Sequence, residues 1–526
     1  MSPRFGERVT MATYGFWKVA QDDPAHVAVI SPTGERITAG ELLGEANRVV
    51  HALRALGLKR GDTFAAMLTN EVAMLELYLA ATQAGFYVTP LNSHLAAPEI
   101  AYIVGDCDAR AVFASGRTAD TCALALDSIG FPAAARFATA EHPGFRPYAE
   151  LKAGHPTSTP ADRTAGASMT YTSGTTGRPK GVRRPLAPVE PEAVAEPNAL
   201  FLRLFGITPH DDGVHLVVSP LYHTAVLNFC TNHLHFGHTV VLMDKWTPEG
   251  TLDLITRHRV TTTHMVPTQF RRLLAMPDAE RARADLSSLR HVIHSAAPCP
   301  VDVKRRMLDW WGNVIFEYYA ASEGGGTLAT PEAWRKHPGT VGNAWPISKL
   351  RVVRDDGAEC APREVGTVYM SMGAHKFEYH KDKDKTASTW KGDFFTVGDA
   401  GYLDEEGFLY LCDRKNDMII SGGVNIYPAE IESVLVVHPK VRDVAVFGIP
   451  DDDWGEHVKA VVELAPGVAE GPALAEELLA FCKEQLAGFK CPKSIDFVPE
   501  LPRDPNGKLY KRKLRDPYWA GRERAI

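Results

Sequence analysis

A segment rich in glycine and hydroxyl side chains, residues 170–182, has the chemistry to bind the phosphates of a nucleotide. It reads Thr-Tyr-Thr-Ser-Gly-Thr-Thr-Gly-Arg-Pro-Lys-Gly-Val. Glycines let backbone N–H groups approach an anion, hydroxyls add neutral donors, and Lys180 can meet a phosphate as a point charge. A surface loop would also contain Gly, Ser, Thr and Pro, but this restricted order favours phosphate binding. The residues predicted to form the site are Thr172, Ser173, Gly174, Thr175, Thr176, Gly177 and Lys180.

The segment is not a Walker A loop. That motif ends in Gly-Lys followed by Ser or Thr, whereas here Pro179 precedes the lysine and Gly181 follows it. A P-loop ATPase or kinase, which would form ADP rather than AMP, is therefore a disfavoured alternative.

The order Thr-Ser-Gly-Thr-Thr-Gly-x-Pro-Lys-Gly resembles the adenylate-forming superfamily of acyl-CoA synthetases, peptide-synthetase adenylation domains and luciferases. Further motifs occur in the family's order, so the resemblance spans nearly the whole chain. It implies that ATP activates a carboxylic acid to acyl-AMP, with release of pyrophosphate, and that the acyl group then passes to a thiol. The implied cofactors are ATP, Mg²⁺ and coenzyme A.

Residues 317–323, Glu-Tyr-Tyr-Ala-Ala-Ser-Glu, resemble the family's Tyr-Gly-x-Thr-Glu segment. The resemblance implies that Tyr319 stacks on adenine, Ser322 bonds the α-phosphate and Glu323 holds Mg²⁺. One carboxylate plus the nucleotide phosphates is the usual protein contribution to such a magnesium site. The segment departs from the family at Ala320, where glycine is usual, and at Ser322, where threonine is usual.

Residues 395–399, Phe-Thr-Val-Gly-Asp, resemble Tyr-x-Thr-Gly-Asp, with the threonine displaced by one position. The resemblance implies that Asp399 and Arg414 contact the ribose; a carboxylate can accept two donors at once. Three residues of the stretch 295–298 are also assigned to the nucleotide site, namely Ser295, Ala296 and Ala297.

Three segments near the end of the chain complete the resemblance. Residues 502–508, Pro-Arg-Asp-Pro-Asn-Gly-Lys, resemble the family's lysine loop, which makes Lys508 the catalytic cation where the carboxylate meets the α-phosphorus. Residues 421–432 resemble the segment that lines the pantetheine tunnel, where Gly422 and Gly423 would leave room for a thiol-bearing arm. The lysines of residues 489–493, Phe-Lys-Cys-Pro-Lys, match a stretch that meets the phosphates of coenzyme A.

These residue types suit nucleotidyl transfer. A carboxylate is a poor nucleophile and the triphosphate repels it, so positive charge must be placed in advance. Mg²⁺ on Glu323 and Thr172, together with Lys180 and Lys508, would offset the charge as pyrophosphate leaves. No side-chain nucleophile is required.

The acid is expected near residues 219–225, Ser-Pro-Leu-Tyr-His-Thr-Ala, which match the segment whose His or aromatic residue lies close to the acyl carboxylate. His223 is therefore a candidate for orienting the acid, although a histidine satisfied by local bonds is the alternative. Residues 227–229, 266–270 and 295–298 are expected to line the acyl pocket, and their apolar character predicts a hydrophobic acid. Whether this acid is an aliphatic chain or a bulky terpenoid or steroid acid stays open.

Composition narrows the class of protein. A chain of 526 residues exceeds one hydrophobic core, so at least two domains are expected. The net charge of −7 argues against nucleic acid or an anionic membrane as a partner. The eight cysteines are far apart and form no CxxC pair, which favours reduced core thiols and a cytoplasmic location. We identify no signal peptide and no apolar run long enough to span a membrane, and the oligomeric state, including a homodimer, stays open.

The elements that must position these residues alternate between helix and strand in the first third of the chain. A capping box, Thr38-Ala39-Gly40-Glu41, opens a helix that Gly57 ends. Strands are predicted at 64–68, 87–89 and 110–114, and helices at 75–84, ended by Gly85, and at 100–104. This order indicates βαβ units and a mostly parallel sheet. Residues 187–197, rich in Ala, Pro, Val and Glu, are interpreted as a solvated, mobile insertion.

A domain boundary is predicted at the charged stretch 413–417, after a strand at 408–411. Beyond it we expect a helix at 428–437, strands at 444–449 and 458–464, and a helix at 473–486. The predicted fold is therefore α/β, with a large N-terminal domain (1–413) of several subdomains, a hinge (414–417) and a small, mobile α+β C-terminal domain (418–526). Rotation about this hinge would exchange Lys508 for the tunnel glycines between the two half-reactions. Asn416 stands where Asp or Lys is usual, so the pivot is a hypothesis.

Two further readings stay open. The acyl group could pass to a carrier-protein thiol or another acceptor instead of coenzyme A. Alternatively, Ala320 and the displaced Thr396 could mark a catalytically silent relative that acts as a binding protein.

Overall fold

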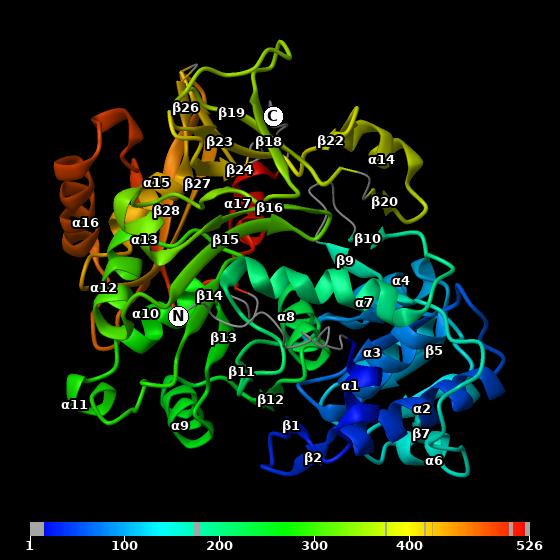
Figure 1. Cartoon of the computed structure of the whole chain (residues 1–526). Coiled ribbons are helices and arrows are strands. Elements are labelled where there is room, and N and C mark those ends of the chain that lie inside the picture. Colours follow the sequence, from blue (N-terminus) through cyan, green and yellow to red (C-terminus); the bar gives the residue numbers. More distant parts are fainter. Residues whose placement is uncertain are drawn as a thin grey trace. The chain divides into compact units, whose positions relative to one another are not determined.

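The computed structural model describes residues 15–172, 179–373, 376–414, 417–422, 424–503 and 509–520 (Figure 1). The chain divides into two compact units. Unit 1 comprises Met1–His264, Pro277–Val292 and Lys376–Thr386, and unit 2 comprises Met265–Met276, Ile293–His375 and Ala387–Ile526. Both units mix sheets with helices, as the predicted α/β class requires.

One sheet of unit 1 is wholly parallel, in the order β7-β6-β5-β3-β4-β8. Its strands are β3 (Thr63–Met67), β4 (Tyr87–Pro90), β5 (Ala109–Ala114), β6 (Arg136–Ala138), β7 (Arg146–Pro147) and β8 (Ala167–Ser168). Helix α2 (Ala39–Ala55) leads into the first of these strands, and the helices that connect them are α3 (Val72–Ala84), α4 (Ala97–Asp106), α5 (Ala119–Ser128) and α6 (Tyr148–Lys152). The predicted βαβ units are thus confirmed.

The predicted ends of the first helices are confirmed as well. The amide of Glu41 donates to Thr38 Oγ1 over 3.2 Å, and the Glu41 carboxylate accepts from the Thr38 amide over 2.8 Å. Gly57 (φ +89°) and Gly85 (φ +72°) follow α2 and α3 in the left-handed region, which a residue with a side chain rarely adopts.

A second sheet in unit 1 runs β13-β11-β12-β1-β2, parallel except where β1 pairs with β2. Its strands are β1 (Val27–Ile30), β2 (Arg36–Thr38), β11 (Val214–Val217), β12 (Thr239–Leu242) and β13 (Thr262–Met265). A small third sheet joins β9 (Thr170–Thr172), β10 (Lys180–Arg183) and β20 (Glu378–Tyr379). Other elements of this unit are α1 (Phe16–Asp22), α8 (Thr224–His235), α9 (Pro248–His258) and α11 (Asp278–Arg281).

The interpretation of residues 187–197 as a solvated insertion is wrong from Pro191 onward, although residues 187–190 are exposed. They run into α7 (Pro191–Ala199), which packs against α8 and a 3₁₀ turn, Leu200–Phe205. Pro191, Ala195 and Ala199 are spaced by four residues and form a buried stripe of small side chains. Proline fits the first turn of a helix because its missing N–H needs no partner there. An ion pair of 2.6 Å between Glu192 and Arg163 fixes the start of the helix.

Unit 2 contains three antiparallel sheet regions. The first joins β15 (Ile315–Ala321), β16 (Gly324–Ala329) and β17 (Asn343–Ala344). The second runs β21 (Trp390–Lys391), β22 (Phe394–Phe395), β19 (Gly366–Ser371), β23 (Asp399–Leu403) and β24 (Leu409–Arg414), with β18 (Lys349–Val353) on β19. The third runs β26 (Val424–Ile426), β25 (Ile419–Ser421), β28 (Gly455–Leu464) and β27 (Val441–Asp451), with β29 (Ser494–Val498) parallel to β28.

The helices of this unit are α10 (Pro267–Leu274), α12 (Val301–Trp311), α13 (Pro331–Lys336), α15 (Pro428–Leu435), α16 (Pro472–Gln485) and α17 (Lys511–Arg515), and α14 (Lys383–Thr389) begins in unit 1. The helices and strands predicted between 428 and 486 are all present. One buried carboxylate, Asp443 on β27, is shared by two arginines. The Arg271 guanidinium of α10 lies 3.0 Å away, and the Arg503 guanidinium donates over 2.9 Å.

The cysteines agree with the expected reduced thiols. All eight are free, and Cys107, Cys122, Cys230, Cys482 and Cys491 are buried. Burial raises the pKa of the Cys107 and Cys122 thiols to about 12, so these side chains are inert. Among the described helices, none has the length and apolar character to cross a membrane.

Candidate active site

In unit 1 the predicted phosphate loop closes a hairpin. Thr172, the last residue of β9, pairs with Lys180, the first residue of β10, so the two candidates face each other across the base of the loop. The candidates Ser173, Gly174, Thr175, Thr176 and Gly177 lie outside the described residues. Helix α4 anchors both sides of the base. The Tyr171 hydroxyl donates to Asp106 Oδ2 over 2.5 Å, and the Tyr102 hydroxyl donates to the Pro179 carbonyl over 3.2 Å.

The side chain of Lys180 already has a partner, which the sequence did not reveal. Its ammonium group forms an ion pair with the carboxylate of Asp382, and both side chains are partly exposed. The segment that carries Asp382 adds β20 to the hairpin, where the His380 amide donates to the Gly181 carbonyl over 2.8 Å. Asp382 Oδ1 also accepts from the Lys385 amide over 2.8 Å, at the start of α14. A contact across about two hundred residues leaves no local sequence signal.

His223 is the residue that precedes α8, and its ring lies 4.2 Å from the ring of Tyr222. The turn before it is held by Asn70, a buried amide that sequence analysis missed. Asn70 Nδ2 donates to the Ser219 carbonyl over 3.1 Å, and the Leu221 amide donates to Asn70 Oδ1 over 2.9 Å. A buried polar side chain with these bonds fixes the backbone on which His223 stands.

The residues of α8 expected to line the acyl pocket, Leu227 and Phe229, are both buried: Leu227 lies in the main hydrophobic core, and Phe229 lies in an aromatic cluster. The Phe229 ring lies 4.9 Å from His264, 5.5 Å from Phe201 and 5.6 Å from Phe205. Burial lowers the pKa of His264 to about 3, so its ring is neutral at physiological pH. This part of unit 1 is therefore apolar, as expected. In unit 2, the ring of Phe270 packs edge-on against His294 at 5.2 Å.

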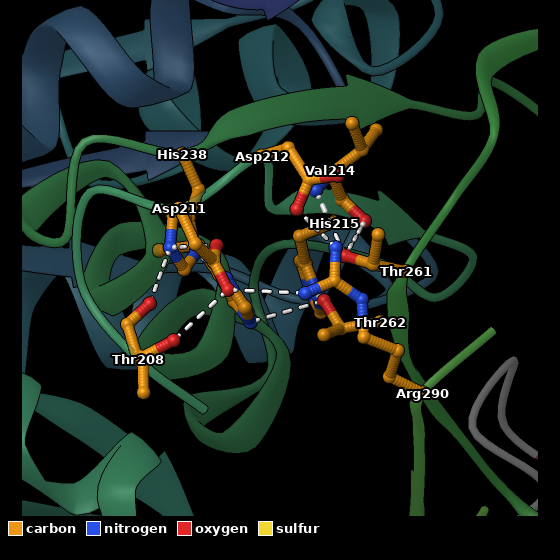
Figure 2. Close-up of polar contacts among 10 residues, drawn as sticks. Thr208, Asp211, Asp212, Val214, His215, His238, Thr261, Thr262 and Arg290 are labelled. Atoms are coloured by element: carbon orange, nitrogen blue, oxygen red, sulfur yellow. Dashed lines mark hydrogen bonds and ion pairs between the residues drawn. The ribbon is translucent and has the colours of Figure 1, made fainter. Parts of the chain in front are cut away.

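A chain of buried histidines continues from this cluster (Figure 2). His215 Nδ1 lies 2.9 Å from Thr262 Oγ1, which lies 3.2 Å from His233 Nε2; His233 Nδ1 lies 2.8 Å from His238 Nδ1. His238 Nε2 lies 2.9 Å from the Thr208 carbonyl, which can only accept. One direction therefore satisfies every bond between neutral rings: His215 donates to Thr262, Thr262 to His233, His233 to His238, and His238 to the carbonyl.

The chain ends at charged groups near the surface of the unit. His238 Nε2 is also 3.0 Å from Asp211 Oδ1, and Arg290 donates to Asp211 Oδ2 over 3.2 Å and to Asp212 (Figure 2). Burial lowers the pKa of His215 to about 3, and it also lowers the pKa of His233 well below its ordinary value. These rings are thus neutral core groups that sequence analysis did not identify.

In unit 2 the residues expected to hold adenosine come together. The hydroxyl of Tyr319, on β15, donates to Asp399 Oδ2 over 2.6 Å. Asp399 begins β23, and its backbone lies opposite that of Arg414 on β24. The two predicted ribose contacts therefore lie on paired strands, and the predicted adenine contact, from a strand of another sheet, hydrogen-bonds to one of them.

Ser322 and Glu323 form the tight turn between β15 and β16, where Ala321 pairs with Gly324. Gly324 (φ +130°) and Gly325 (φ +71°) complete the turn, and a Cβ on Gly324 would lie 2.9 Å from Met372 Sδ. This backbone therefore requires glycine and presents the hydroxyl and the carboxylate side by side.

The stretch of candidates at 295–297 follows β14 (His291–His294). Ser295 is buried and hydrogen-bonds to the side chain of Tyr318. Ala296 has φ +73°, a conformation unusual for a residue with a side chain, and strain of this kind is typical of functional sites. Ala297 is half-buried.

Gly422 lies in the turn between β25 and β26, with φ +57°. Its amide donates to the Trp454 carbonyl over 2.8 Å, and an added Cβ would come within 2.4 Å of the Trp454 ring. Trp454 was missed by sequence analysis, yet it is 56% exposed, which is rare for tryptophan and typical of a binding surface. Gly423 and Lys508 lie outside the described residues.

The chain is also similar to known protein families, relatives and solved structures. The family model described as "AMP-binding enzyme" matches residues 16–375, and that described as "AMP-binding enzyme C-terminal domain" matches residues 430–508. The chain is similar to the fatty acid–[acyl-carrier-protein] ligase ScoC of Streptomyces coeruleorubidus, with 32% identity over 96% of each chain. It is 34% identical to a feruloyl-CoA synthase of Amycolatopsis over 95% of this chain and 98% of that one. Its structure resembles ATP-bound MatB of Rhodopseudomonas palustris, with a TM-score of 0.82, 31% identity, and coverage of 96% of this chain and 98% of that one.

Proposed function

The chain belongs to the family of AMP-binding enzymes and is an AMP-forming acid–thiol ligase; we propose that it activates a hydrophobic carboxylic acid to acyl-AMP and transfers the acyl group to coenzyme A. The observation that carries this proposal is the bond of 2.6 Å between Tyr319 and Asp399. It joins an aromatic ring suited to adenine and a carboxylate suited to ribose hydroxyls.

The phosphates would be bound by Lys180 and the loop that it follows. Mg²⁺ would be held by Glu323, because a single carboxylate in a rigid turn leaves the other positions of the ion to phosphate oxygens and water. The described residues contain no group of three or more His, Cys, Asp or Glu that would hold a metal on its own, which fits this division. Bound Mg²⁺ would withdraw charge from the phosphates as pyrophosphate leaves.

The acid would be oriented by His223 and would extend toward the apolar surroundings of Leu227 and Phe229. Lys508 would stabilise the charge that develops where the carboxylate oxygen meets the α-phosphorus. We retain the division into an N-terminal domain (1–413), a hinge (414–417) and a C-terminal domain (418–526) as part of the proposal. A hinge there would let one small domain serve both half-reactions.

Coenzyme A is favoured as the acceptor by exposed aromatic rings and by lysines in unit 2. Trp454 and Phe489 are 56% and 57% exposed, respectively, and offer rings on which an adenine can stack. Lys493 Nζ lies 5.9 Å from the Trp454 ring centroid and 3.0 Å from Asp451, and Lys490 Nζ lies 2.8 Å from Glu430. These lysines would meet the phosphates of coenzyme A. Free, buried cysteines suit the reducing cytoplasm, where we place this reaction.

The alternative acceptor is the thiol of a carrier protein, since the similar ScoC is a fatty acid–[acyl-carrier-protein] ligase. A catalytically silent binding protein is the alternative of a different class. Two measurements together separate the three possible functions. The protein is mixed with ATP, Mg²⁺ and a panel of free acids, and the exchange of labelled pyrophosphate into ATP is measured for each acid.

We expect acid-dependent exchange that is strongest with hydrophobic acids, and a hydroxamate when hydroxylamine is added. Thioester formation is then compared between coenzyme A and a phosphopantetheinylated carrier protein. Lys508→Ala should abolish exchange, whereas Lys513→Ala, an exposed lysine of α17, should leave it unchanged. Formation of ADP, or no exchange with any acid, would refute the proposal.

A further inference from the structure

A charged pair is buried in unit 2, and its carboxylate belongs to the strand that carries Tyr319. Lys304 of α12 donates to Glu317 Oε2 of β15 over 2.7 Å. Lys304 is 0% exposed and Glu317 is 6% exposed. His294, the last residue of β14, has its Nε2 3.5 Å from the same Glu317 oxygen. The Lys304 ammonium lies 4.8 Å from the ring centroid of Trp334 on α13.

This carboxylate is linked to both backbone segments assigned to the nucleotide in this unit. Glu317 precedes Tyr319 by two residues, and side chains two apart in a strand point to the same face. His294 immediately precedes Ser295, the first residue of the strained turn with Ala296. A shift or rotation of β15 would therefore have to break the buried pair before Tyr319 could leave Asp399.

A gain in folding stability does not explain why this charged pair is buried. Removing two charges from water is costly, and apolar side chains of similar volume often stabilise a core as well or better. The rest of this strand offers such side chains, since Ile315 and Tyr318 are buried. What an ion pair provides and an apolar contact does not is a fixed distance and direction between two elements.

We propose that Lys304 and Glu317 are positioning residues that set the register of β15, and with it the affinity of the enzyme for ATP. The inference rests on the proposed role of Tyr319 and Asp399 in binding adenosine. It deepens that proposal, because the affinity for ATP would then depend on a buried pair that does not contact the nucleotide.

The test uses variants that remove the pair without leaving one charge buried alone. The double variant Lys304→Met, Glu317→Gln removes both charges and keeps approximately the volume. The matched control is Arg335→Gln, Asp309→Asn, which removes an exposed ion pair of 3.5 Å that also involves α12 but joins it to α13. Each full-length variant is compared with the parent by thermal unfolding, by calorimetric binding of Mg-ATP, and by the KM values for ATP and for the acid in pyrophosphate exchange.

We expect the double variant to fold, to bind Mg-ATP about tenfold or more weakly, and to show an increased KM for ATP with an unchanged KM for the acid. The control variant should match the parent in all measurements. A folded double variant with the parent's ATP affinity would overturn the inference, as would an equal loss of ATP and acid affinity. Should the double variant fail to fold, Lys304→Arg keeps the charge but lengthens the link; an ATP affinity equal to that of the parent in this variant would overturn the inference.

The proposed function and the further inference can be refuted independently of each other. If the parent protein shows no acid-dependent exchange, the proposed function is lost, while the calorimetric result still reports on nucleotide positioning. If the parent shows exchange and the pair proves irrelevant to ATP binding, only the inference is lost.

Discussion

Acid should destabilise unit 1 through its buried histidines. Burial lowers the pKa of His215 and of His264 from the ordinary value of 6.5 to about 3. Below pH 6.5 the unfolded chain binds protons that the folded chain takes up only near pH 3. The free energy of unfolding must therefore decrease as the pH falls through 6.5, and the loss is complete only below about pH 3.

The magnitude follows from the two pKa values. At pH 5 an unfolded histidine is almost fully protonated and a folded one is not, so each ring lowers the free energy of unfolding by about 2 kcal/mol, roughly a 30-fold change in the equilibrium constant. His215 and His264 together account for a decrease of about 4 kcal/mol between pH 7.5 and pH 5.

The matched test is His215→Asn. The amide nitrogen of Asn can replace Nδ1 as the donor to Thr262, while the group that titrates is lost. Hydrogen exchange of peptides that span β11, corrected for the intrinsic rate at each pH, measures the free energy of local opening. Between pH 7.5 and pH 5 the variant should lose about 2 kcal/mol less than the parent, whereas His94→Asn at an exposed position should behave like the parent. An equal loss in His215→Asn and the parent would refute the reasoning.

Three further predictions concern contacts that the structure revealed. Asp382→Asn should release Lys180 and increase ATP affinity about fivefold, as expected for about 1 kcal/mol from a partly exposed pair; calorimetry that shows weaker binding would contradict this. Gly422→Val should displace the Trp454 ring and reduce thioester formation while pyrophosphate exchange persists, and an equal loss of both activities would argue against a role in the second step. Asp443→Asn leaves two arginines without their shared carboxylate and should destabilise unit 2 by about 3 kcal/mol, measured by hydrogen exchange of β27 peptides, and unchanged exchange there would disprove the role of this carboxylate.

The fold was largely predictable because local signals agreed with the tertiary structure. The capping box at Thr38, the glycines that end α2 and α3, and the apolar strands each depend on neighbouring residues only. Helix α7 was missed because its buried stripe is built from proline and alanine, which composition alone does not distinguish from a solvated segment.

Sequence could propose candidate site residues only where they are adjacent along the chain. Tyr319 and Glu323 belong to one short motif, and Thr172 and Lys180 flank one loop. Residues that pair with this part of the chain, such as Asp382 with Lys180 and Lys304 with Glu317, come from separate elements. Their roles depend on burial and distance, and neither quantity can be read from residue type.

Burial also decides what each lysine can do. The pair between Lys180 and Asp382 is partly exposed, so its strength is of the order of 1 kcal/mol, and the phosphates of a nucleotide can compete for the lysine. The pair between Lys304 and Glu317 is buried, and opening it would leave two unpaired charges in the core at a cost of several kcal/mol. If the proposed phosphate site is correct, a bound nucleotide would recruit Lys180 but not Lys304. A lysine paired with a carboxylate is thus exchangeable in one unit and fixed in the other.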